Sequence, residues 1–156
     1  MQSPAGELAL PTPTLTKFGY PGTVVHDDGN WIVLVRPQQV TLGSLVLASR
    51  RSVQQFSALD DGGFRALGPA VRRIEAALAA FVGYQKINYL MLMMVDPDVH
   101  FHVIPRYDGE RRFEGFSFPD AGWPGAPDLK TAVSPPPEVL ARLVDVLRRN
   151  WPDGHA

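Results

Sequence analysis

Two of the four histidines of this sequence lie two residues apart, in the segment Asp-Val-His-Phe-His-Val-Ile-Pro-Arg at residues 98–106. Side chains alternate between the two faces of a β-strand, so Asp98, His100 and His102 are expected on one face, about 7 Å apart. Two imidazoles and a carboxylate on one face are unfavourable unless they are hydrated, paired or bound. The cluster is therefore a candidate functional site, and a histidine pair on an ordinary surface is the alternative interpretation.

The same three residues could in principle bind a metal ion. Imidazole and carboxylate ligands suit Zn²⁺ or Mn²⁺, and histidines two residues apart on a strand can chelate. A closed site needs more ligands, however, and only His26 or a distant carboxylate could supply them. A metal site formed by Asp98, His100 and His102 is a minor alternative, and no bound metal or cofactor is expected.

The apolar pattern predicts the elements that would position these residues. Apolar residues spaced 4, 3, 4 and 3 apart predict an amphipathic helix over residues 67–81, closed by Gly83. A second amphipathic helix is expected near the C-terminus, over residues 136–150, where prolines suit the first turn. Five segments have strand character: residues 23–26, 31–35, 45–48, 86–95 and 99–107. The first two are expected to form a hairpin, and residues 86–95, apolar on both faces, a central strand.

Composition limits the classes of function. A chain of 156 residues with 45% hydrophobic content is expected to form one domain, residues 23–156, preceded by a proline-rich arm at residues 1–22. The formal net charge of −1 provides no basic field for a nucleic-acid backbone. No apolar run is long enough for a membrane span, no secretion signal is apparent, and the absence of cysteine is compatible with a reducing compartment. A cytoplasmic protein without membrane or nucleic-acid partners is expected.

A stretch of 27 residues, 108–134, carries four aromatic side chains among glycines and prolines. Loops of this length without regular structure are usually functional or cover a ligand. The alternative is that Phe113, Phe116, Phe118 and Trp123 complete the edge of a core or form a dimer contact.

The segment Asp-Val-His-Phe-His-Val-Ile-Pro-Arg-Tyr resembles the signature of the histidine-triad family, in which three histidines alternate with apolar residues and often continue into Ile-Pro-Arg. Residues 42–47 and 53–59 are similar to the family's second strand pair and its link to the helix, so the resemblance covers about residues 23–107. It implies an α+β fold: an antiparallel sheet of about five strands, a main helix packed on it and a C-terminal helix. It also implies a twofold homodimer.

In such enzymes the middle histidine attacks the α-phosphate of a nucleotide, and water or another acceptor resolves the nucleotidyl-histidine. The resemblance places that role on His100, with His102 donating to a phosphate oxygen or orienting His100. A neutral imidazole whose second nitrogen is held by a hydrogen bond suits this chemistry. Arg106 could add positive charge near the phosphate, with a surface ion pair as the alternative.

The sequence departs from the family pattern at three places. Asp98 replaces the first histidine of the triad, Ser44 stands where many members have a histidine, and residues 94–97 lack the Gly, Gln and Ser or Thr that contact phosphate in many relatives. Members also hold the ribose hydroxyls with an acidic or amide residue, and the equivalent stretch, residues 36–39, offers only Gln38 and Gln39.

These residues predict a nucleotide phosphate hydrolase or nucleotidyl transferase that acts through His100, with a dinucleoside polyphosphate or nucleoside phosphoramidate as substrate. The alternative is a degenerate member that retains the fold and binds nucleotides without catalysis.

Overall fold

The computed structural model describes residues 10–153, so residues 1–9 of the expected arm and residues 154–156 lie outside the described residues. The described residues form three α-helices, one short 3-10 helix and seven strands. In chain order they are α1 (Pro13–Lys17), β1 (Val24–Asp27), β2 (Trp31–Val35), β3 (Leu45–Ser49), η1 (Phe56–Ala58), α2 (Asp61–Val82), β4 (Lys86–Leu90), β5 (His100–Arg106), β6 (Glu110–Phe113), β7 (Phe116–Pro119) and α3 (Pro137–Arg149).

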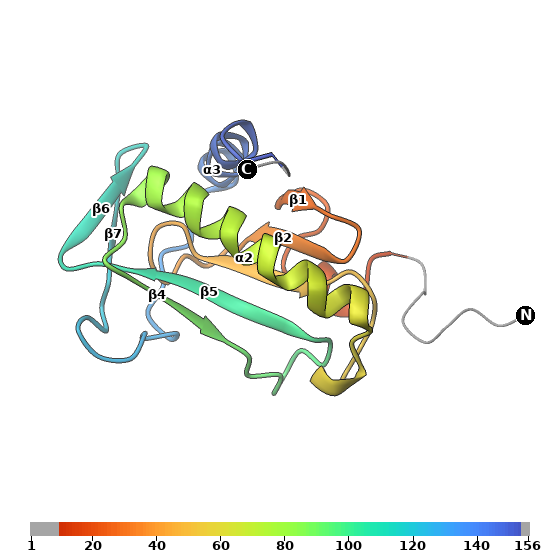
Figure 1. Ribbon diagram of the computed structural model, residues 1–156. Coiled ribbons are helices and arrows are strands. Elements are labelled where there is room, and N and C mark those ends of the chain that lie inside the picture. The colour runs from red at the N-terminus through yellow and green to blue at the C-terminus, as the bar shows by residue number, and fades with distance from the viewer. Residues whose placement is uncertain (1–9, 154–156) are drawn as a thin grey trace, which may run out of the picture.

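Five of the strands form one antiparallel sheet in the order β1-β2-β3-β5-β4 (Figure 1). The expected hairpin of β1 and β2 is present. Asp28 accepts hydrogen bonds from the backbone of Asn30 and Trp31 in the turn, and Gly29 has a φ of 91°, a conformation that glycine adopts without strain. The α+β fold class with a five-stranded antiparallel sheet is confirmed.

Helix α2 lies across one face of the sheet (Figure 1). It buries Ala70, Ile74, Leu78 and Val82 on its inner side and ends at Gly83, which has a left-handed backbone. The helix begins six residues before the predicted start at residue 67, because Asp60 caps it by accepting a hydrogen bond from the Gly63 amide. The predicted main helix is therefore confirmed and is longer than its apolar spacing indicated.

The C-terminal helix α3 is also confirmed. Its buried residues Leu143, Val144 and Leu147 join the core that includes residues of α2 and the sheet, and the helix contacts β1. In Figure 1 it lies above α2 and β1. No helix among residues 10–153 combines the length and hydropathy that a membrane crossing requires.

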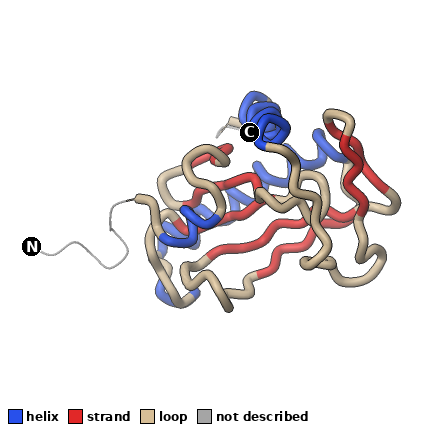
Figure 2. The backbone as a smooth tube through the Cα atoms, turned by 180° about the vertical axis from the view of Figure 1, so that it is seen from behind, coloured by secondary structure: helices blue, strands red, loops and turns tan. Residues whose placement is uncertain are grey.

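The opposite face of the sheet is covered by the N-terminal segment, which Figure 2 shows from behind. Leu15 of α1 and Phe18, just after it, are buried against Ile32, Leu34, Val46 and Ala48 of β2 and β3. Thr12 caps α1 by accepting a hydrogen bond from the Leu15 amide, and Pro13 occupies the first position of the helix. Residues 10–22 of the expected arm are thus packed on the sheet.

The expectation of a central strand over residues 86–95 is wrong. Strand β4 stops at Leu90 and is the edge of the sheet, paired only with β5. Ile87 and Tyr89 of β4 pack on the α2 side, where the Tyr89 hydroxyl donates to Glu75, whereas Lys86 and Asn88 alternate with them. Beyond Leu90 the chain leaves the sheet, and Met94 is 88% exposed.

Residues 108–134 contain two strands that the sequence analysis did not predict. Strands β6 and β7 form a hairpin whose turn residues, Glu114 and Gly115, both have positive φ, as in a type I′ turn. Phe118 is buried in the core and Phe113 packs against Phe81. These two aromatic residues therefore complete the core, which is the alternative considered for this stretch.

Candidate active site

His100 and His102 lie on β5, on the face of the sheet opposite α2. Their ring centroids are 5.0 Å apart, and the rings meet edge to face. Phe18 lies over both of them, with centroid distances of 5.9 Å to His100 and 5.8 Å to His102. The N-terminal segment therefore forms one wall around the histidine pair.

The tautomer of His100 follows from its hydrogen bond. Its Nδ1 lies 2.6 Å from the backbone oxygen of Asp98. A carbonyl oxygen can only accept, so Nδ1 carries the proton, and in the neutral ring Nε2 keeps its lone pair. His100 is only 1% exposed but is one of the residues lining a pocket. The geometry provides an oriented nitrogen base next to that pocket.

Asp98 contributes to the site through its backbone, while its carboxylate is directed elsewhere. The carboxylate accepts from the hydroxyls of Thr14, at 2.8 Å, and Ser52, at 2.6 Å, and Asp98 is buried. Strand β5 begins only at His100, so Asp98 lies just before the strand. The structure brings His100 and His102 together. The hydrogen bonds of the Asp98 carboxylate instead join α1 to the segment after β3.

The pocket beside the histidines has a volume of about 210 Å³. Its polar lining consists of Lys17, Arg36, Gln38, Asp96, His100 and His102, and its apolar lining of Phe18, Leu92, Met93, Met94, Val95 and Leu129. Lys17 and Asp96 form an ion pair with a distance of 3.2 Å. With two cationic side chains against one carboxylate, the pocket has an excess of positive charge, which favours an anionic ligand.

His102 is held as a neutral ring. Burial, followed by the charges of His100 and Arg36, lowers the pKa of His102 to about 4. The side chain is 8% exposed, and its Nδ1 is buried without a hydrogen-bond partner among the described residues. A buried polar atom left without a partner is unfavourable, so this nitrogen is available to a ligand in the pocket.

Two of the predicted binding residues, Gln39 and Ser44, have structural roles outside the pocket. Gln39 is fully buried and braces the turn between β2 and β3, with Nε2 donating to the backbone oxygens of Arg36 and Ser44. The Ser44 hydroxyl donates to the Thr41 backbone within the same turn. Gln38 alone of the predicted substrate-binding group lines the pocket.

Arg106, the remaining predicted phosphate contact, is buried in an ion pair. Its Nε and Nη2 donate to the two carboxylate oxygens of Asp120 at 2.7 and 3.0 Å, and its Nη1 donates to Asn88. Arg106 therefore anchors the segment after β7 to the sheet and does not line the histidine pocket.

Several lining residues were not identified from the sequence. Lys17 and Phe18 belong to a segment that was expected to be an arm, and Met93 and Met94 to a segment that was expected to be a strand. Arg36 lies in the stretch compared with ribose-binding positions, and its charge was a signal that could have identified it.

The three residues considered for a metal do not converge. Within residues 10–153, no three His, Cys, Asp or Glu side chains are grouped so as to hold a metal ion. The Asp98 carboxylate is occupied by hydroxyl donors.

Comparisons with known proteins give structural relatives only. No protein-family model and no curated protein matches the chain. A histidine triad protein from Sinorhizobium meliloti is 20% identical with a TM-score of 0.67, covering 90% of this chain and 96% of that one. The NitFhit protein of C. elegans is 16% identical with a TM-score of 0.62, covering 94% of this chain, which spans only 29% of that protein.

A third structure is the diadenosine triphosphate hydrolase of Plasmodium falciparum. It is 10% identical with a TM-score of 0.60, covering 83% of this chain and 76% of that one. At these identities the similarity concerns the fold. This chain has the fold of the histidine-triad proteins.

Proposed function

We propose that this protein is a nucleotide phosphate hydrolase or nucleotidyl transferase whose nucleophile is His100. The observation that carries the proposal is the hydrogen bond between Nδ1 of His100 and the backbone oxygen of Asp98. This bond directs the proton to Nδ1 and leaves the Nε2 lone pair for attack on phosphorus. The positive pocket and the fold shared with a diadenosine triphosphate hydrolase support a nucleotide substrate.

The proposed reaction has two displacements. In the first, Nε2 of His100 attacks the α-phosphorus, a P–N bond forms, and the bond to the leaving group breaks with its electron pair on the departing oxygen or nitrogen; a departing nitrogen also takes up a proton from solvent. In the second, water or another acceptor attacks phosphorus, its proton passes to solvent, and the P–N bond breaks to restore His100. The neutral ring of His102 stabilises the phosphate because its N–H donates a hydrogen bond to one of the phosphate oxygens.

A radiolabelled substrate tests this mechanism directly. The protein is mixed with a dinucleoside polyphosphate or an adenosine phosphoramidate labelled at the α-phosphorus and quenched with detergent at alkaline pH, where a P–N bond survives. We expect label on the wild-type chain and on a His26→Ala variant, whose histidine lies on β1, and none on His100→Ala. Turnover that persists in His100→Ala would exclude His100 as the nucleophile.

A second candidate function is nucleotide binding without turnover, because His100 is 1% exposed and Phe18 covers it. Binding of a nucleoside monophosphate by calorimetry, combined with no turnover of any labelled substrate, would favour this function. Turnover of any labelled nucleotide substrate would reject this second function.

We further propose that the protein is a homodimer. Strand β4 is the edge of the sheet and has no partner strand on its outer side among the described residues. An unpaired edge is a template for a second copy. Light scattering coupled to size-exclusion chromatography should give twice the mass of the 17.1 kDa chain, and a monomer at micromolar concentration would reject the dimer.

A further inference from the structure

Arg36 presents a cationic group to the pocket without a carboxylate partner. No Asp or Glu of the described chain lies within ion-pair distance of it. Asp96 acts on Arg36 only at longer range, and its carboxylate is paired with Lys17. Within residues 10–153, the one side-chain hydrogen bond of Arg36 runs from Nη1 to the Gln38 backbone oxygen, and its Nε is buried without a partner. The excess positive charge of the pocket is therefore that of Arg36.

The backbone of Arg36 is firmly held. Its amide donates to the Ser44 carbonyl at 3.0 Å, which continues the β2–β3 pairing by one residue, and its carbonyl accepts from Gln39 at 2.6 Å. Arg36 follows Leu34 by two residues, so it faces the same side of the sheet as Leu34, which packs with Phe18. The guanidinium is thus directed to the histidine face by the sheet itself.

The strand register separates Arg36 from the reacting nitrogen. The pairings of β2 with β3 and of β3 with β5 place Arg36 two residues further along the sheet than His102 and four further than His100. With strands about 4.8 Å apart and a rise of about 3.4 Å per residue, the Cα atoms of Arg36 and His100 are about 17 Å apart, against about 12 Å for Arg36 and His102. Arg36 therefore lies at the end of the pocket remote from His100.

We infer that Arg36 forms a second anion-binding subsite, and that the substrate carries a phosphate on its sugar in addition to the phosphate attacked by His100. This inference rests on the proposed function and specifies its substrate class. In dinucleotide-binding folds a carboxylate holds free ribose hydroxyls, whereas an arginine accommodates a phosphate on the ribose. A guanidinium with a free Nε–H suits two-point binding of phosphate oxygens.

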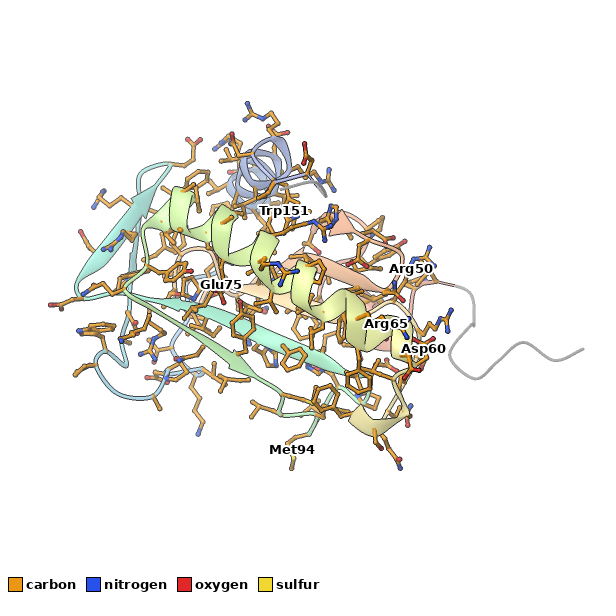
Figure 3. The ribbon with its side chains drawn as sticks, in the orientation of Figure 1. Arg50, Asp60, Arg65, Glu75, Met94 and Trp151 are labelled. Atoms are coloured by element: carbon orange, nitrogen blue, oxygen red, sulfur yellow. The ribbon has the colours of Figure 1, made fainter. Side chains whose placement is uncertain are left out.

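The apolar lining of the pocket fits a ligand whose two anionic groups are separated by an apolar part. The loop between β4 and β5 contributes the apolar residues Leu92, Met94 and Val95 to the lining, and the carboxylate of its Asp96 is paired with Lys17. Met94, labelled in Figure 3, projects from the lower edge of the molecule. The loop between β4 and β5 can therefore contact an apolar part of the ligand, while its anionic groups are left to the histidines at one end and Arg36 at the other.

Calorimetric titration of the full chain with adenosine 5′-monophosphate and with adenosine 3′,5′-bisphosphate tests the subsite. We expect the wild type to bind the bisphosphate at least about ten times more tightly at low salt, with a smaller preference at higher salt. In Arg36→Gln the preference should fall below about twofold, because the bisphosphate loses much more affinity than the monophosphate. Arg36→Lys, which keeps the charge, should retain part of the preference.

Arg72→Gln is the matched control, because Arg72 is an exposed arginine on α2, on the other face of the sheet. It should leave the preference unchanged, and thermal unfolding of each variant verifies that it folds. Equal binding of the two nucleotides by the wild type would overturn the subsite while leaving the proposed function intact. Equal weakening of both nucleotides in Arg36→Gln would assign Arg36 to the reacting phosphate instead. Failure of the wild type to bind either one would overturn both proposals.

Discussion

The buried ring of His102 determines how the stability of this fold should change when the pH is lowered from 7 to 5. Burial is the main reason that the pKa of His102 is lowered from 6.5 to about 4. The imidazole of the unfolded chain has the ordinary value of 6.5. Between pH 6.5 and pH 4 the unfolded state therefore binds more protons at this residue than the folded state, so the free energy of unfolding falls as the pH falls.

The size of the effect follows from these two pKa values. At pH 7 both states leave most of the rings neutral, and the difference is small. At pH 5 the unfolded ring is almost fully protonated while the folded ring is mostly neutral, and linkage gives a loss of about 2 kcal/mol relative to pH 7. Such a loss is a substantial share of the roughly 5–15 kcal/mol that stabilises a typical domain.

The assay is urea unfolding of the wild type and of His102→Gln at pH 7, 6 and 5, followed by tryptophan fluorescence. Between pH 7 and pH 5 the wild type should lose about 2 kcal/mol more than the variant. Burial also lowers the pKa of His26, so a His26→Gln variant serves as the control for the acid sensitivity of that second histidine. A difference between wild type and His102→Gln that stays constant with pH would refute the assignment of a buried neutral ring.

Three substitutions outside the reaction centre should destabilise the fold, each measured as the change in the free energy of unfolding in urea. Asp120→Ala leaves the buried guanidinium of Arg106 unpaired and should cost about 3–5 kcal/mol; an effect below 1 kcal/mol would contradict the buried ion pair. Asp98→Ala removes the acceptor of two hydroxyl groups and should cost about 3 kcal/mol, whereas Asp108→Ala at an exposed site should be nearly neutral. Gly43→Ala forces a side chain into a φ of 92° against Leu78 and should cost about 1–3 kcal/mol; unchanged stability would disprove that backbone conformation.

Local patterns in the sequence were sufficient for the main elements. The spacing of apolar residues identified α2 and α3, the Asp-Asp-Gly-Asn turn identified the β1–β2 hairpin, and the alternation around His100 and His102 identified β5 and its polar face. These features depend on residues close together in the chain, where helix and strand periodicity act directly.

The sequence did not reveal where β4 ends or where it lies in the sheet. An apolar run has the same composition whether it continues as a central strand or leaves the sheet at an edge. Which of the two happens depends on the segments that pack against it. Here α2 covers one face of β4, and the residues after Leu90 leave the sheet to line the pocket.

The amino-acid sequence by itself determined the pair of imidazoles on one strand and the α+β class. Only the tertiary structure decided that the Asp98 carboxylate is directed to Thr14 and Ser52 and that Arg36 is in the pocket while Arg106 is outside it. The physical reason is that the direction of a charged side chain depends on partners distant in the chain, since burial is tolerated only where an opposite charge or hydrogen-bond partner is supplied.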